Sequence, residues 1–150
     1  MPKSEEKNPS ILALNSLIAS YTVTSQNARF CHWNVLGPVF EDNHEIFGDI
    51  YDMLSEQVDI FAEQVRILGE YPLSKLGDYL KETKISEIEW TLSASDMQKV
   101  LHENLLSISS DMEKFIEETD ADACTQDVII AAKKDLDKKR WMLRAMLGKK

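Results

Sequence analysis

The sequence predicts an all-α protein in which four long helices form one bundle, with a short helix in the crossover between the second and the third. Apolar residues recur at spacings of three and four over four long segments, which is the period of a helix with one buried face. Only 5 Gly and 4 Pro interrupt the 150 residues, and no two turn signals lie at hairpin spacing. This length suits one domain with a sizeable core.

The first predicted helix runs from Pro9 to the Gly37-Pro38 pair. Pro9 suits the first helical position, where the N–H that proline lacks would have no partner. The apolar residues that share one face are Ile11, Leu14, Ile18, Tyr21 and Ala28. Glycine at position 37 is suited to a left-handed cap, and proline at 38 is suited to open the next helix. We therefore expect a hairpin with almost no loop.

The second predicted helix spans residues 39–68, and Gly69 and Pro72 end it. Its apolar stripe alternates spacings of four and three, as in a coiled-coil core. The stripe consists of Phe47, Tyr51, Leu54, Val58, Phe61, Val65 and Leu68. Residues 73–92 are less periodic and predict a crossover with one short helix at 74–81, a connection found in some four-helix bundles.

The third predicted helix starts within residues 93–96, where hydroxyl side chains precede an acidic first turn, and ends near Thr119. Its apolar face consists of Met97, Leu101, Ile108, Met112 and Phe115. An acidic segment, TDADACTQD, then leads to the fourth helix, which continues to Gly148. The residues of its buried face are Ile129, Ala132, Leu136, Leu143 and Met146.

These elements predict three regions: a flexible tail at 1–8, the bundle at 9–148 and a basic tip at 149–150. The first residues lack the apolar run of a secretory signal, and no 18 consecutive residues are apolar, so we expect a cytoplasmic protein with no membrane partner. The two cysteines, Cys31 and Cys124, are too few for a disulfide framework and predict buried, reduced thiols.

One face of the second helix is acidic. Six acids recur there at spacings of four and three, namely Glu45, Asp49, Asp52, Glu56, Asp59 and Glu63. Like charges at these spacings repel one another, so the face is stabilised by cations. The net charge of −9 disfavours nucleic acid and anionic membranes as partners and favours metal ions. The alternative is an ordinary solvated acidic face.

The candidate metal ligands lie at two separate places. His32 and His44 flank the predicted hairpin and should be neighbours. Asp59 and Glu63 are spaced to hold one cation, but they lie 15 to 19 residues beyond His44, about 22 to 29 Å along the helix. One chain therefore does not bring all four to one metal. An antiparallel copy related by a two-fold axis would combine both ends and create two equal sites.

A di-iron centre inside the bundle would need Glu-x-x-His pairs on two helices. Only Glu41-x-x-His44 is present. Three residues before His102 the chain has Lys99 rather than an acid, and the fourth helix has no histidine. The spacing therefore disfavours a site within the bundle. For His32 and His44 taken singly, a hydrogen-bonded or interface histidine remains the alternative.

Two stretches of the chain resemble the Dps miniferritins, which belong to the ferritin-like proteins. The segment His32-Trp33-Asn34-Val35-Leu36-Gly37-Pro38 is followed by Phe40, His44, Asp59, Glu63, Leu68-Gly69 and Pro72. The similarity continues at Asp122-x-x-Thr125-x-Asp127 and at Asp135-Leu136-Asp137-Lys138. It covers most of the chain, and is densest over residues 28–72.

The resemblance implies a ferritin-like four-helix subunit that assembles, through two-fold dimers, into a hollow dodecamer. It implies that Asp59 and Glu63 of one subunit and His32 of the dimer mate bind iron, with His44 at a second, weaker position. It also implies a ferroxidase that oxidises Fe(II) to Fe(III), preferably with hydrogen peroxide, and stores the mineral. Where the family commonly has an acid four residues after His44, this chain has Gly48.

The resemblance also implies that Asp122 and Asp127, with Asp120, line three-fold entry pores, whereas helix N-capping is the alternative for Asp120 and Asp122. The family's DNA binding relies on a basic tail. Here only Lys149 and Lys150 form a basic tip, so DNA binding is not expected. Two competing functions remain: a non-specific DNA-binding protein that protects the nucleoid with secondary iron binding, and a structural helical assembly without metal chemistry.

Overall fold

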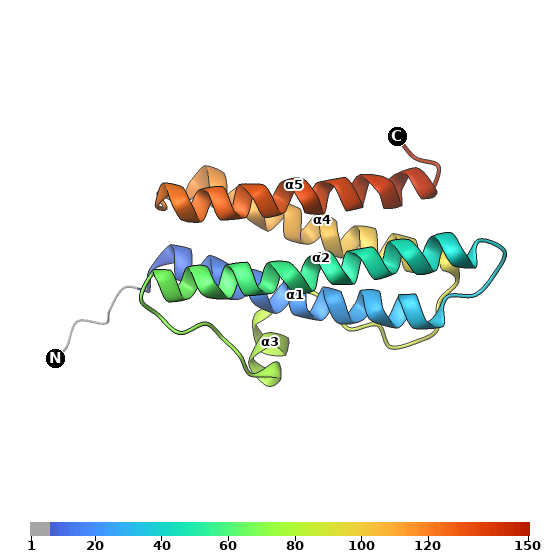
Figure 1. Cartoon of the computed structure of the whole chain (residues 1–150), viewed down its shortest axis with the longest axis horizontal. Coiled ribbons are helices and arrows are strands. Elements are labelled where there is room, and N and C mark those ends of the chain that lie inside the picture. Colours follow the sequence, from blue (N-terminus) through green and yellow to red (C-terminus); the bar gives the residue numbers. More distant parts are fainter. Residues whose placement is uncertain (1–6) are drawn as a thin grey trace.

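The computed structural model describes residues 7–150 and contains five helices in that range (Figure 1). They are α1 (Pro9–Asn34), α2 (Phe40–Ile67), α3 (Leu76–Glu82), α4 (Ala94–Glu118) and α5 (Ala123–Met146). The all-α bundle with a short crossover helix is confirmed, and the predicted ends differ from the observed ones by a few residues. Most of the predicted flexible tail, residues 1–6, lies outside the described residues.

Side-chain caps fix where three of the helices begin. The Asn8 carboxamide oxygen accepts from the Ser10 N–H at 2.9 Å, which leaves Pro9 as the first residue of α1. Ser93 caps α4 and Asp122 caps α5 in the same manner. Each cap supplies an acceptor to an N–H that has no partner within the helix. The predicted helix starts at Pro9 and near Ser93 are confirmed.

The hairpin between α1 and α2 is longer than predicted. Gly37 has a φ of +118°, in the left-handed region that favours glycine. However, α1 already ends at Asn34, and Pro38 lies in the turn rather than in the first turn of α2. Five residues, 35–39, join the helices, because Val35 is extended and fully buried and has to leave the helix before the chain turns.

The two hairpins, α1 with α2 and α4 with α5, lie side by side and enclose one core (Figure 1). Most of the predicted apolar faces are buried there, including Leu14, Ile18, Phe61 and Leu136 with no exposed surface. Met146, in the last turn of α5, is an exception at 39% exposure. Within the described part of the chain, no helix is both long and apolar enough to cross a membrane.

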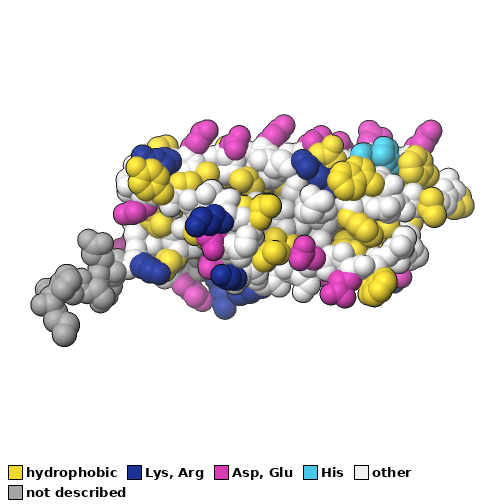
Figure 2. All heavy atoms as spheres, turned by 90° about the horizontal axis from the view of Figure 1, so that it is seen from below, with side chains coloured by type: hydrophobic (Ala, Val, Ile, Leu, Met, Phe, Trp, Pro, Cys, Tyr) yellow, Lys and Arg dark blue, Asp and Glu magenta, His cyan; other side chains and the backbone are white. Residues whose placement is uncertain are grey.

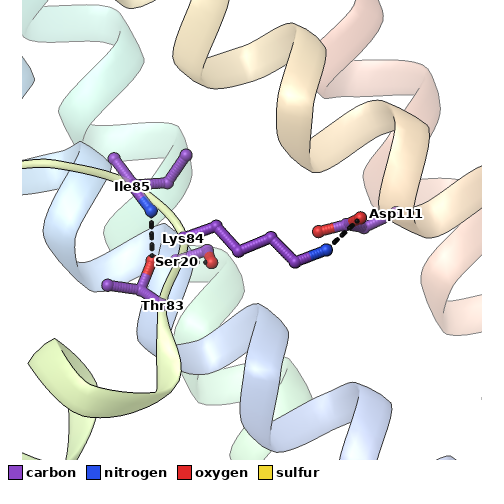
Figure 3. A network of polar contacts seen from close by, with 5 residues as sticks. All are labelled: Ser20, Thr83, Lys84, Ile85 and Asp111. Atoms are coloured by element: carbon purple, nitrogen blue, oxygen red, sulfur yellow. Dashed lines mark hydrogen bonds and ion pairs between the residues drawn. The ribbon is translucent and has the colours of Figure 1, made fainter.

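Polar contacts attach the crossover to α1 and α4 (Figure 3). The hydroxyl of Ser20 on α1 lies 2.9 Å from that of Thr83, which also accepts from the Ile85 N–H at 3.0 Å. Lys84 donates to Asp111 on α4 at 3.1 Å. The crossover and α3 therefore lie against α1, and the outer face of α2 is left open.

The side chain of Asn27, on α1, is the centre of this attachment. Its amide nitrogen donates to the Ser86 carbonyl at 2.9 Å and to the Asn104 side chain at 3.0 Å, and its oxygen accepts from the Ile88 N–H at 3.0 Å. Asn27 is only 4% exposed, whereas its partners are exposed or half-buried, so these three bonds are partly shielded from water. One residue thus joins α1, the crossover and α4.

Candidate metal centre

The hairpin brings His32 and His44 together, as the sequence predicted. His32 lies in the last turn of α1 and His44 in the first turns of α2. Their rings stack, with centroids 3.7 Å apart and planes inclined by 13°. Both side chains are partly buried, so the pair faces the surface at one end of the bundle.

Each imidazole is oriented by the backbone of the other helix. The Nδ1 of His32 lies 2.6 Å from the His44 carbonyl oxygen, and the Nδ1 of His44 lies 2.7 Å from the His32 carbonyl oxygen. A carbonyl oxygen only accepts, so each Nδ1 carries the proton and donates it. In the neutral imidazole this tautomer leaves the lone pair on Nε2, which is the atom that can bind a metal ion.

The reciprocal bonds also give a partner to a backbone carbonyl at the end of α1. A carbonyl in the last turn of an α-helix has no partner within the helix, and His32 is in that position in α1. Phe40 stacks on His44 at 5.0 Å, and Tyr51 meets His32 edge-on at 5.5 Å. The guanidinium of Arg29 lies 5.0 Å from the centre of the Tyr51 ring. The histidine pair is thus fixed on both sides before any metal is bound.

Asp59 and Glu63 lie on the exposed outer face of α2, separated by one helical turn. All six acids of the predicted face are exposed. Figure 2 shows acidic side chains along one edge of the molecule, with histidine and neighbouring apolar side chains towards one end of that edge. Among residues 7–150, Asp49 is the one member of this face with an ion-pair partner, Lys139 at 3.6 Å. Asp59 and Glu63 are thus free to bind a cation.

The imidazoles and the carboxylate pair do not meet within one chain. Helix α2 is continuous from Phe40 to Ile67, so the helical rise places Asp59 and Glu63 about 22 to 29 Å from His44. In the described region, no three His, Cys, Asp or Glu side chains gather closely enough to hold a metal ion. A complete site built from these four residues therefore needs a second chain.

The other candidate ligands contribute nothing to this end of the bundle. Burial raises the pKa of the Cys31 thiol to about 12, so it stays protonated although it precedes His32 in sequence. Cys124, predicted to be buried, is exposed because it lies in the first turn of α5 on the side away from the core. His102 is on α4, where burial and the charges of Arg140 and Arg144 lower its pKa.

The predicted pore residues are exposed, and one of them has a structural role. Asp122 accepts from the Thr125 N–H at 2.9 Å and from its hydroxyl at 2.7 Å, as an N-cap does. These bonds hold the pKa of Asp122 below its usual value. Asp120 and Asp127 are exposed on either side of it.

An exposed apolar edge lies beside the histidine pair at the hairpin, and it was not predicted as a surface from the sequence. The hairpin edge, as we call it, consists of Trp33, Leu36, Val39 and Phe40, which are 64%, 78%, 55% and 41% exposed. Apolar surface of this kind next to a functional group is typical of an interface between proteins. The sequence signal was available, since four large apolar residues cluster at a turn where polar residues are usual.

Known proteins share this fold over nearly the whole chain. The family model of the ferritin-like domain matches residues 11–150 of this chain. The DNA protection during starvation protein of Listeria monocytogenes is 31% identical over 140 residues, or 91% of this chain and 90% of that protein. The crystal structure of a Dps protein from Bacillus brevis superposes with a TM-score of 0.89 at 30% identity, covering 98% of this chain and 99% of that one. The structure of Dps from Listeria innocua soaked with cobalt also has a TM-score of 0.89 at 30% identity, covering 97% and 95%.

Proposed function

Because this chain is a Dps miniferritin of the ferritin-like family, we propose that it is a ferroxidase that oxidises Fe(II), preferably with hydrogen peroxide, and stores the ferric product in a hollow dodecamer. The observation that carries the proposal is the state of the four candidate ligands. Backbone carbonyls engage the Nδ1 atoms of His32 and His44, which leaves both Nε2 atoms available at one end of α2, and within residues 7–150 Asp59 and Glu63 have no ion-pair partner towards the other end. Imidazole and carboxylate together favour iron, manganese or zinc over calcium and magnesium.

The site is completed by a second copy of the chain. A two-fold axis at the middle of α2 places the histidine end of each subunit against the carboxylate end of the other, and yields two equal sites. The exposed hairpin edge supports this arrangement, since its apolar side chains would be buried in the contact. His32 of one subunit then joins Asp59 and Glu63 of the other, and His44 serves the neighbouring position.

The proposed reaction is an electron transfer from iron to peroxide rather than a hydrolysis, and the side chains hold the iron. Two Fe(II) ions each release one electron, and one hydrogen peroxide accepts both as its O–O bond breaks. With two water molecules taken up, the products are two FeO(OH) units and four protons. The carboxylates stabilise the growing positive charge on iron, and the fixed imidazoles hold the ion without reorganisation. Consuming Fe(II) and peroxide together limits the formation of hydroxyl radicals.

We also propose that Asp127, with Asp120 and Asp122, guides cations through the shell, because converging carboxylates attract them. The bonds to Thr125 leave Asp122 ionised at neutral pH. Within the cell we place the protein in a bacterial cytoplasm, where Fe(II) and peroxide meet.

Anaerobic loading with Fe(II), followed by peroxide, tests the activity. Asp59→Ala should reduce the rate of iron oxidation by at least about tenfold, because one of two carboxylates that hold the ion is lost. Asp52→Ala removes the same charge from the same face of α2 outside the site and should oxidise iron at the wild-type rate. Wild-type oxidation no faster than a protein-free blank would refute the proposal.

DNA protection is the second candidate function, since the relatives carry that name. The net charge of −9 opposes it, because phosphate binding depends on counterion release by basic residues. A gel shift at low and at physiological salt distinguishes the two. Retardation at both would favour the DNA-binding function.

A further inference from the structure

Gly48 is buried on α2, one helical turn after His44, and lies directly against His32. A Cβ atom at this position would be 3.0 Å from Cε1 and 3.1 Å from Nδ1 of the His32 ring. These separations are shorter than ordinary van der Waals contact. The His32 ring thus occupies the space that a side chain at position 48 would need.

The hydrogen bond from His32 to the His44 carbonyl passes through this space. In an α-helix the carbonyl of residue 44 points towards the N–H of residue 48. To donate to that carbonyl at 2.6 Å, the Nδ1 of His32 has to approach across position 48. Even a methyl group there would push the ring away from the carbonyl and from the His44 ring stacked on it.

The other glycines of the described region have different roles. Gly37, Gly69 and Gly148 have positive φ angles, which glycine adopts without strain. Gly77, in α3, has nothing within 4 Å of its added Cβ. Glycine inside a helix weakens it relative to alanine, and Gly48 is in the interior of α2. The close approach of the His32 ring explains why glycine occupies this position although it destabilises the helix.

We propose that Gly48 is a positioning residue that seats His32, so that the two imidazoles keep their reciprocal bonds and hold both Nε2 atoms towards the metal. The metal position beside His44 then receives imidazole and no carboxylate from residue 48. Imidazole favours borderline ions such as cobalt and zinc over hard ones. The proposal rests on the proposed function only for the identity of the ligand, a divalent metal ion.

Cobalt(II), added without oxygen and followed by its visible absorption, measures the effect on binding in the intact assembly. Gly48→Ala should weaken cobalt binding about tenfold, the lower end of what disturbing an orienting contact costs. Gly77→Ala is the matched control and should bind as the wild type does. A crystal structure of apo Gly48→Ala should show the bond from His32 to the His44 carbonyl lengthened by a few tenths of an ångström.

A thermal double-mutant cycle tests the seating without metal. Gly48→Ala should lower Tm in the wild-type background, because its methyl group meets the His32 ring. It should raise Tm in the His32→Ala background, where the ring is absent and alanine is the better helix former. The same change of Tm in both backgrounds, or unchanged cobalt affinity in Gly48→Ala, would overturn the proposal. Wild-type protein that binds no cobalt would instead count against the proposed function, and the cycle would still decide the role of Gly48.

Discussion

Subunit mixing decides whether the metal site is shared between chains. His32→Ala removes the imidazole end of a subunit, and Asp59→Ala removes part of its carboxylate end. If each site takes His32 from one subunit and Asp59 from its mate, a dimer of the two variants has one site with both defects and one intact site. Neither pure variant has any intact site.

The expected recovery follows from the symmetry. Equal amounts of two variants that pair at random give heterodimers in half of the dimers, and each heterodimer has one intact site of two. About one quarter of all sites should then be intact, so the mixture should oxidise iron at about one quarter of the wild-type rate. A site contained in one chain predicts no recovery, because every subunit carries one of the two defects.

The assay co-expresses the two variants with different tags, verifies mixed assemblies by mass spectrometry and follows iron oxidation by peroxide after anaerobic loading. Co-expression of Asp59→Ala with Glu63→Ala is the matched control. These residues belong to the same end of α2, so each site in that mixture lacks one carboxylate and no recovery is expected. Verified mixing of His32→Ala with Asp59→Ala that leaves the rate at that of the pure variants would refute the shared site.

Two further predictions concern stability. Asp122→Ala should lower the free energy of unfolding by about 1 kcal/mol, because α5 loses its N-cap. Since the bonds from Thr125 lower the pKa of Asp122, this contribution is present at neutral pH and is lost as the pH falls through the folded-state pKa, so urea unfolding of wild type and variant should converge in acid. Asn27→Ala should cost about 1 to 2 kcal/mol in the same assay, because three partly buried hydrogen bonds that attach the crossover and α4 to α1 are lost together. A loss below about 0.5 kcal/mol would mean that water replaces those partners.

The helices and the proximity of the histidines could be predicted from the sequence because both follow from local spacing. A period of 3.6 residues identifies a helix face, and a turn at Gly37 brings the preceding and following helices together. The exposure of the acidic face of α2 follows in the same way, since its apolar stripe has to face the core. These inferences need no knowledge of distant parts of the chain.

Contacts between helices could not be predicted, because they depend on rotations and offsets that spacing does not fix. The reciprocal bonds of His32 and His44 require α1 and α2 to approach within hydrogen-bonding distance at one register. The exposure of Cys124 and Met146, in the first and last turns of α5, depends on how α5 is rotated and placed against its neighbours. Gly48 appeared in the sequence only as a missing acid, whereas its contact with His32 requires coordinates.

Under the proposed function, the separation of the candidate ligands along α2 makes iron oxidation depend on dimerisation. A subunit that has not yet dimerised presents two imidazoles at one place and two carboxylates about 22 to 29 Å away. Each half alone offers an ion few ligands, so an isolated subunit should bind Fe(II) weakly and react slowly. In the proposed dimer the halves would meet, and the exposed hairpin edge would be covered in the same step. Under the proposed function, iron chemistry is therefore confined to assembled protein, where the ferric product has a shell to enter.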